Sequence, residues 1–200
     1  MDPAPFPEFG DPSYSTYEAP SLVRTCSAAR QIENFMDESH FAWVHEGILG
    51  DRLHAKAPSF EVTRDGHALQ FGWDERPNAI HPPGHWREYR VQLPFTIHLQ
   101  QRRHQDDEVE TLYFAVCPSG ARESVGFLLI SRNYTLPPDQ EEERRRLTAT
   151  VGAQDKRIVE AQRPEQVPFD LAAELHIKGP DTAAVAYRRA MAELGVVVDS

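Results

Sequence analysis

Residues 34–45 read Asn34-Phe-Met-Asp37-Glu-Ser-His40-Phe-Ala-Trp-Val-His45. Two histidines five residues apart lie in an aromatic run, and a carboxylate precedes the first of them by three positions. On a straight α-helix, five residues turn about 500°, so the two imidazoles would lie about 140° apart. Both can bind one metal ion only if the helix bends, bulges or ends between them. Asp37 shares the helix face of His40 and can hydrogen-bond its ring. The alternative is a buried aromatic helix whose histidines are satisfied by other groups.

The same residues carry a resemblance to a known family. Glu33-Asn-Phe-Met-Asp-x-x-His-x-x-x-x-His45 resembles the iron-binding motif of the Rieske non-haem iron oxygenases. The branch it resembles contains vanillate O-demethylase, dicamba monooxygenase and phthalate dioxygenase. That family takes its third iron ligand from a downstream Asp, and residues 154–161, Gln-Asp-Lys-Arg-Ile-Val-Glu-Ala, are similar to the helix that carries it. The resemblance extends from about residue 5 to the C-terminus.

The resemblance implies a role for each site residue. His40, His45 and Asp155 would be the ligands of Fe(II), a facial triad that leaves positions open for dioxygen. Asn34 would lie near the iron. Asp37 would lie between the iron and the Rieske centre of a neighbouring subunit, bridging their histidine ligands. Without the resemblance, the favoured interpretation of Asp155 is a solvated helix carboxylate paired with Lys156 or Arg157.

The two cysteines, Cys26 and Cys117, bear on the electron source. Each is solitary, so we expect free, buried thiols in a reducing compartment rather than a disulfide. A Rieske cluster takes two Cys and two His ligands, and no histidine follows either cysteine within three residues. Residues 6–12 resemble the segment that follows the Rieske domain in full-length members. The resemblance therefore implies an external Rieske [2Fe-2S] donor, either a Rieske ferredoxin or a Rieske-bearing subunit, together with a reductase.

Composition narrows the class of protein. A net charge of −10 disfavours a nucleic-acid-binding face, which would be basic. No apolar run approaches the roughly 20 residues that span a bilayer, and no signal peptide opens the sequence. We therefore expect a soluble, cytoplasmic protein with neither nucleic acid nor membrane as its partner. The boundaries that we expect are a Pro- and aromatic-rich arm over residues 1–20, packed onto the body, and a catalytic domain over residues 21–200.

Periodicity and turn residues predict the elements. Asp65-Gly66 between two alternating runs is the strongest hairpin signal. His81 and His85 flank two prolines, which favours a loop over a helical zinc site. Strands are predicted over 21–26, 89–98, 109–116 and 124–134, and helices from Ala28 into the histidine motif, from Pro137 past Asp155, and over 182–194.

This order, with consecutive strands followed by long helices, indicates an α+β domain with an antiparallel sheet. The resemblance implies a helix-grip (START/Bet v 1-like) fold, in which the sheet wraps around long helices and encloses a central cavity, assembled as a ring-shaped trimer. The expected cavity walls are apolar or aromatic: Trp43, Ile48, Phe95, Phe114, Phe127 and Leu129.

The resulting hypothesis is an oxidoreductase, the catalytic subunit or fragment of a non-haem iron oxygenase. It would use dioxygen to hydroxylate or oxidatively demethylate an apolar or aromatic molecule. Three alternatives stay open: a helix-grip ligand-binding protein without catalysis, a non-catalytic assembly partner of a complete oxygenase subunit, and a zinc hydrolase that uses the same ligands. A stoichiometric iron content separates the hypothesis from the ligand-binding alternative.

Overall fold

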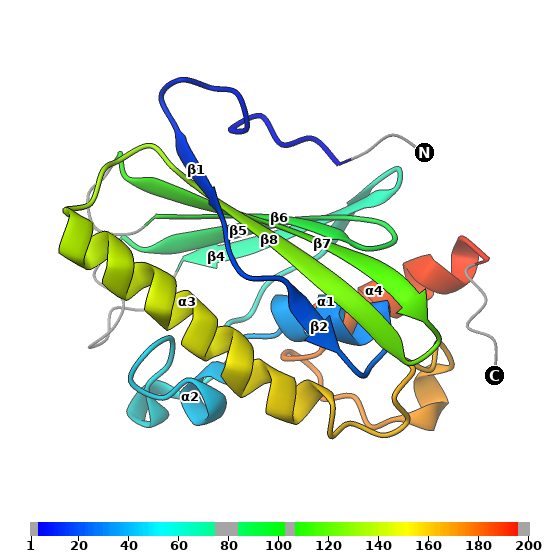
Figure 1. Ribbon diagram of the computed structural model, residues 1–200. Helices are drawn as coiled ribbons and strands as arrows, with labels where there is room; N and C mark the ends of the chain where they lie inside the picture. Colours follow the sequence, from blue (N-terminus) through cyan, green and yellow to red (C-terminus); the bar gives the residue numbers. More distant parts are fainter. Residues whose placement is uncertain (1–3, 75–83, 103–106, 196–200) are drawn as a thin grey trace.

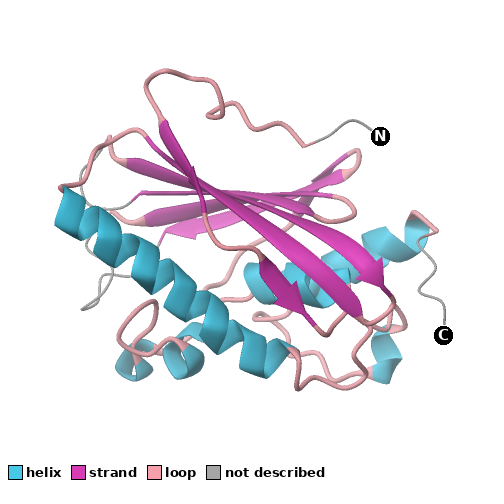
Figure 2. Cartoon of the chain, viewed as in Figure 1, coloured by secondary structure: helices cyan, strands magenta, loops and turns pink. Residues whose placement is uncertain are grey.

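One antiparallel sheet and a layer of helices make up the structure, a computed structural model that describes residues 4–74, 84–102 and 107–195. Within these residues eight strands form the sheet. The helices cover one face of it, and the N-terminal segment crosses the other face (Figures 1 and 2). The predicted α+β class with an antiparallel sheet is confirmed.

The strands follow one another in an antiparallel meander from β3 to β8, and the order across the sheet is β1-β8-β7-β6-β5-β4-β3, with β2 also pairing with β8. The Asp65-Gly66 hairpin is confirmed, with Gly66 at φ 58° and Asp65 opposite Ala68. The strands are β1 (Ser15–Glu18), β2 (Leu22–Arg24), β3 (Thr63–Asp65), β4 (Ala68–Asp74), β5 (Trp86–Gln92), β6 (Thr96–Arg102), β7 (Val109–Gly120) and β8 (Glu123–Arg132).

The single strand predicted over residues 89–98 is wrong. The chain reverses at Leu93-Pro94-Phe95, and Gln92 pairs with Thr96 across the turn. The prediction failed because the apolar alternation continues through the turn, where Leu93 is as buried as the strand residues on either side of it.

The described residues contain four α-helices: α1 (Ala28–Met36), α2 (Phe41–Val44), α3 (Pro138–Val159) and α4 (Thr182–Glu193). Ser27 caps α1 as predicted, since its side chain accepts a hydrogen bond from the backbone N–H of Arg30. The helix expected to continue from Ala28 into the histidine motif instead ends at Met36. A separate one-turn helix, α2, follows after Asp37-Glu-Ser39.

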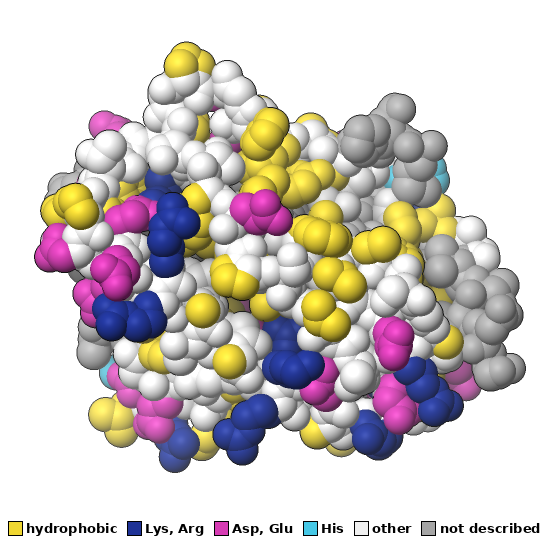
Figure 3. Space-filling model, in the orientation of Figure 1, with side chains coloured by type: hydrophobic (Ala, Val, Ile, Leu, Met, Phe, Trp, Pro, Cys, Tyr) yellow, Lys and Arg dark blue, Asp and Glu magenta, His cyan; other side chains and the backbone are white. Residues whose placement is uncertain are grey.

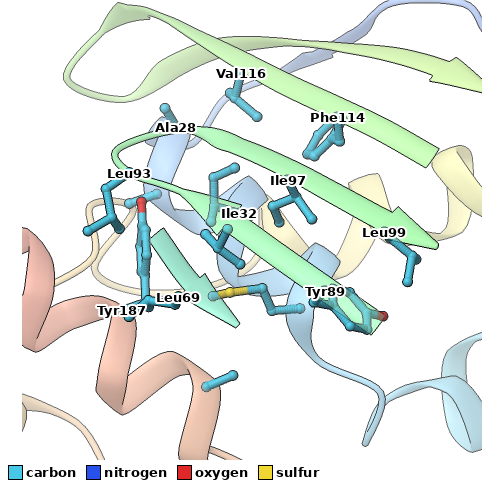
Figure 4. Close-up of a cluster of buried hydrophobic side chains, with 14 of the residues drawn as sticks. Ala28, Ile32, Leu69, Tyr89, Leu93, Ile97, Leu99, Phe114, Val116 and Tyr187 are labelled. Carbon is cyan, nitrogen blue, oxygen red and sulfur yellow. The ribbon is translucent and has the colours of Figure 1, made fainter. Parts of the chain in front are cut away.

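The core lies between the sheet and α1 and α4. Figure 4 shows Ile32 of α1 beneath Ile97, and Tyr187 of α4 beside Leu93. The Tyr187 hydroxyl donates to the Pro94 carbonyl at 2.8 Å, so this fully buried phenol is satisfied. A buried ion pair joins the two helices, because Arg188 of α4 donates to both carboxylate oxygens of Glu33 in α1. These contacts fix α1, which leads into the histidine motif.

The N-terminal segment packs onto the outer face of the sheet, as predicted. Phe6 stacks on Tyr113 with ring centroids 4.5 Å apart. Glu8 is buried and accepts hydrogen bonds from Thr111 and Gln100, each at 2.8 Å. No helix of the described residues is long and apolar enough to cross a bilayer.

Both thiols are free, but only Cys26 is buried. The expectation of a buried thiol at Cys117 is wrong, because β7 runs on past the sheet core to Gly120 and its last residues are exposed.

Candidate metal centre

The histidines of the motif flank a helix of a single turn. His40 is the residue before α2 and His45 the residue after it. Since the helix ends at His45, the straight-helix separation of the two rings does not apply, and their centroids lie 5.1 Å apart. The chain then folds back tightly, and a Cβ at Gly50 would lie 2.3 Å from the Phe41 carbonyl carbon. Glycine at position 50 therefore permits the close return that shapes this site.

Asp155 reaches both histidines from α3. Its Oδ1 lies 2.9 Å from Nε2 of His45 and 3.4 Å from Nε2 of His40. One ligand atom from each of the three residues lies within 4.8 Å of the others. The structure thus brings together the three residues for which the sequence predicted a metal site, although they are more than a hundred positions apart in the chain.

A second group holds each imidazole at its other nitrogen. Nδ1 of His40 lies 2.9 Å from Oδ2 of Asp37, and Nδ1 of His45 lies 2.7 Å from Oε1 of Gln154. Both oxygens accept hydrogen bonds, so both rings donate through Nδ1 and turn Nε2 toward Asp155. This arrangement orients metal-binding histidines in proteins. The contact between Asp37 and His40 was predicted; the role of Gln154 was not, and its only sequence signal is its place next to Asp155.

The local charges oppose the effect of burial. Burial disfavours the charged form of His40, but Asp155 and Asp37 outweigh it and raise the pKa of His40 to about 9. Burial likewise raises the pKa of Asp155, yet the two histidines hold it well below its usual range. Burial also raises the pKa of Asp37, but hydrogen bonds from His40 and Ser39 outweigh this effect and lower the pKa. Asp37 and Asp155 are therefore ionised, and they give this buried centre a negative charge that a metal cation can balance.

These residues fit a divalent metal ion. Nε2 of His40 is buried and makes no hydrogen bond within the described part of the chain, although it faces the Asp155 carboxylate. An unsatisfied imidazole nitrogen of this kind is costly unless a ligand completes it. Two imidazoles and one carboxylate are the donor set of non-haem ferrous sites.

The centre opens into a cavity of about 210 Å³ between α3 and the inner face of the sheet. Asn34 lines this cavity together with the three candidate ligands. Its walls are mainly apolar, and they include Phe35, Phe41, Ile48, Leu49, Tyr89, Leu99, Leu112, Leu128, Ile130, Leu147 and Val151.

Of the expected cavity walls, Ile48 alone is among the lining residues. Phe114 is instead part of the buried core, stacked on Phe35 at 4.6 Å. Trp43 and Phe127 are exposed, at 59% and 42%. The prediction failed in β8 because Phe-Leu-Leu-Ile is apolar at every position, so the sequence could not show that the alternate residues Leu128 and Ile130 face inward.

Of the two histidines predicted to lie in a loop, only His85 can be compared with this centre. His85 is buried outside the cavity, and His81 lies outside the described residues.

Comparison with known proteins places these observations in a family. Residues 24–196 match the family described as the vanillate O-demethylase oxygenase C-terminal domain. Among curated proteins, methylxanthine N1-demethylase NdmA of Pseudomonas putida is 28% identical over 171 residues, which cover 84% of this chain and 47% of the relative. Methylxanthine N3-demethylase NdmB of the same species is 30% identical over 136 residues, covering 66% of this chain and 38% of the relative. The chain thus spans about half the length of NdmA, or less in the case of NdmB.

Solved structures agree with the family match. NdmA of P. putida with caffeine superposes with a TM-score of 0.82 at 26% identity, covering 94% of this chain and 54% of that one. Dicamba monooxygenase bound to dicamba superposes with a TM-score of 0.75 at 18% identity, covering 97% of this chain and 63% of that one, and shows the fold alone. The predicted helix-grip-like fold is confirmed by these neighbours. The chain belongs to the vanillate O-demethylase oxygenase C-terminal domain family, the catalytic domains of Rieske oxygenases.

Proposed function

We propose that this chain is the catalytic part of a Rieske-type non-haem Fe(II) oxygenase that hydroxylates or oxidatively demethylates a small apolar or aromatic molecule. The observation that carries the proposal is the convergence of Nε2 of both histidines on one carboxylate oxygen, at 2.9 and 3.4 Å, beside an apolar cavity. Iron bound there would supply the activation of dioxygen.

Each group of residues at the site would have a separate role. His40, His45 and Asp155 would hold the ion, while Asp37 and Gln154 fix the two rings through their Nδ1 atoms. Burial of His45 and the apolar cavity walls would keep bulk water from the centre. Asp37 retains partial exposure, at 34% of its side chain, while it bonds His40. It therefore offers a polar connection from the surface to a candidate iron ligand, in keeping with the bridging role that the family implies.

Electrons would come from a Rieske [2Fe-2S] protein and its reductase, since no histidine follows Cys26 or Cys117 within three residues, as a Rieske cluster motif requires. We expect a homo- or hetero-trimer, with the electron donor docking near Asp37, and a cytoplasmic location. Light scattering of the purified protein tests the trimer.

The test of the iron site uses Asp155→Ala. We expect this variant to fold but to lose bound iron, as measured by metal analysis of the purified protein, and to lose turnover when a Rieske donor and reductase are supplied. Asp139→Ala, which removes an exposed carboxylate from the first turn of the same helix, is the control and should keep both. Full iron content in Asp155→Ala would overturn the proposal. A wild-type protein that never carries stoichiometric iron would instead support a ligand-binding or assembly role.

A further inference from the structure

Each charged side chain that the described residues contribute to the cavity wall is paired with a side chain of opposite charge or with a histidine. Arg144 of α3 donates to Glu110 of β7 at 2.5 Å. Arg87 of β5 forms an ion pair with Glu38, and both side chains are buried. Asp155, the remaining charged residue of the wall, faces His40 and His45. The wall therefore presents each charge to a protein partner of opposite sign.

This pairing discriminates against an anionic substrate. A carboxylate that enters an apolar cavity loses its hydration, at a cost of several kcal/mol unless new partners replace the water. Here the guanidinium groups of Arg87 and Arg144 are already bound to Glu38 and Glu110, so a second carboxylate would meet both a neutralised cation and a like charge. An uncharged molecule avoids this cost.

Among the uncharged polar side chains that line the same cavity, Gln101 and Thr148 are engaged. Gln101 donates to Glu110 at 2.8 Å, and the Thr148 hydroxyl donates to the Arg144 carbonyl at 3.0 Å. Asn34 makes no side-chain hydrogen bond to any other described residue. Its carboxamide offers two donors and one acceptor on the same cavity as the candidate iron ligands.

We infer that the cavity selects an uncharged, mainly apolar molecule and that Asn34 hydrogen-bonds its polar atom. The volume of about 210 Å³ lies below that of typical drug-sized pockets, which fits a molecule of one or two rings. This inference rests on the proposed function, because it names the class of substrate for that site.

The test is equilibrium binding by calorimetry, without oxygen or an electron donor, so that no turnover occurs. The probes are two matched pairs that differ only in charge: 4-methoxybenzamide with 4-methoxybenzoate, and 2-naphthamide with 2-naphthoate. We expect at least one amide to bind at millimolar concentration or below, about tenfold or more tightly than its carboxylate. The inference is overturned if a carboxylate binds as tightly as its amide, or if neither amide binds.

Two variants separate the parts of the inference. Asn34→Ala should weaken amide binding by about tenfold, whereas Asn133→Ala, which changes an exposed residue just after β8 and outside the cavity, should not. Glu110→Gln leaves the Arg144 cation without its carboxylate, so it should improve binding of the carboxylate probe and narrow its deficit relative to the amide. Circular dichroism checks the fold of each variant. Unchanged amide affinity in Asn34→Ala, or unchanged carboxylate affinity in folded Glu110→Gln, contradicts the corresponding part.

Iron content, measured on the same samples, reports on the proposed function separately. A protein that prefers amides but retains no iron contradicts the oxygenase and leaves the cavity selectivity standing. A protein that retains iron and prefers carboxylates does the reverse.

Discussion

Two oxygen atoms outside the candidate ligand set orient the histidine rings of this site. An imidazole presents its Nε2 lone pair to a metal only when Nδ1 carries the proton and the ring is correctly oriented. Asp37 and Gln154 supply this control, one for each ring. They differ in charge, since an anion holds His40 and a neutral amide holds His45. A hydrogen bond to an anion increases the electron donation of an imidazole to a metal, so we expect His40 to be the stronger metal ligand of the two.

Gln154→Leu should weaken metal binding without removing a ligand. The variant deletes the acceptor for Nδ1 of His45 and keeps similar volume, so His45 loses the contact that fixes its orientation. We expect affinity for Fe(II) to fall by about 10- to 100-fold, as measured by competition with a chelator. Gln140→Leu, at an exposed position of α3, serves as the control and should bind iron like the wild type. Equal affinity in the two variants would show that Gln154 does not position the ring.

At the scale of elements, the site depends on α2, a helix of one turn whose conformation must be fixed by the surrounding chain. A single helical turn has no independent stability in water. Its position comes from the chain that returns after it, where Gly47 N donates to the Gly50 carbonyl and Gly50 lies against the backbone of Phe41. The α3 helix, in contrast, is long and carries interspersed acidic and basic side chains on its exposed face (Figure 3). A rigid helix thus delivers the carboxylate to a loop-like element that bears both histidines.

Gly50→Ala should disrupt the histidine pair. An added Cβ would lie 2.3 Å from the Phe41 carbonyl carbon and 2.4 Å from the Ala42 nitrogen, both of which are backbone atoms that cannot rotate away. We expect a loss of about 1–3 kcal/mol in the free energy of unfolding, together with weaker iron binding. Chemical denaturation and metal analysis measure the two effects. In Gly120→Ala the new Cβ meets nothing closer than 3.9 Å, so this control should retain wild-type iron and stability. If Gly50→Ala matches it, the close return is unimportant.

Across the whole molecule, the sequence could predict what local pattern encodes. The strand runs, the hairpin at Gly66 and the long helix through Asp155 follow from periodicity and turn residues. The pairing of the histidine motif with the downstream carboxylate was implied by the family resemblance instead. Local pattern alone could not predict contacts between distant segments. Gln154 meets His45 across 109 positions, and no periodicity distinguishes it from an exposed helix residue. The turn within residues 89–98 was likewise hidden, because the apolar alternation continues through it. The inward face of β8 was hidden because its four consecutive apolar residues show no alternation.

The attachment of the N-terminal segment to the sheet should depend on pH through Glu8. Burial raises the pKa of Glu8, but hydrogen bonds from His98 and Thr111 outweigh it and hold the pKa at about 2, below the ordinary value of 4.5. A carboxyl with a lowered pKa in the folded state stabilises the protein above the unfolded pKa, and this stabilisation is lost as the pH falls toward the folded one. The window therefore lies between about pH 4.5 and pH 2.

Glu8→Gln tests this dependence, because it keeps the size of the side chain and removes its charge. Urea denaturation should show the variant to be less stable than the wild type near neutral pH, with the difference shrinking as the pH falls through the window set by Glu8. Glu18→Gln, an exposed position of β1, should show little difference at either pH. A difference for Glu8→Gln that stays constant down to about pH 3 would mean that the segment is held by packing of Phe6 on Tyr113 rather than by the carboxylate.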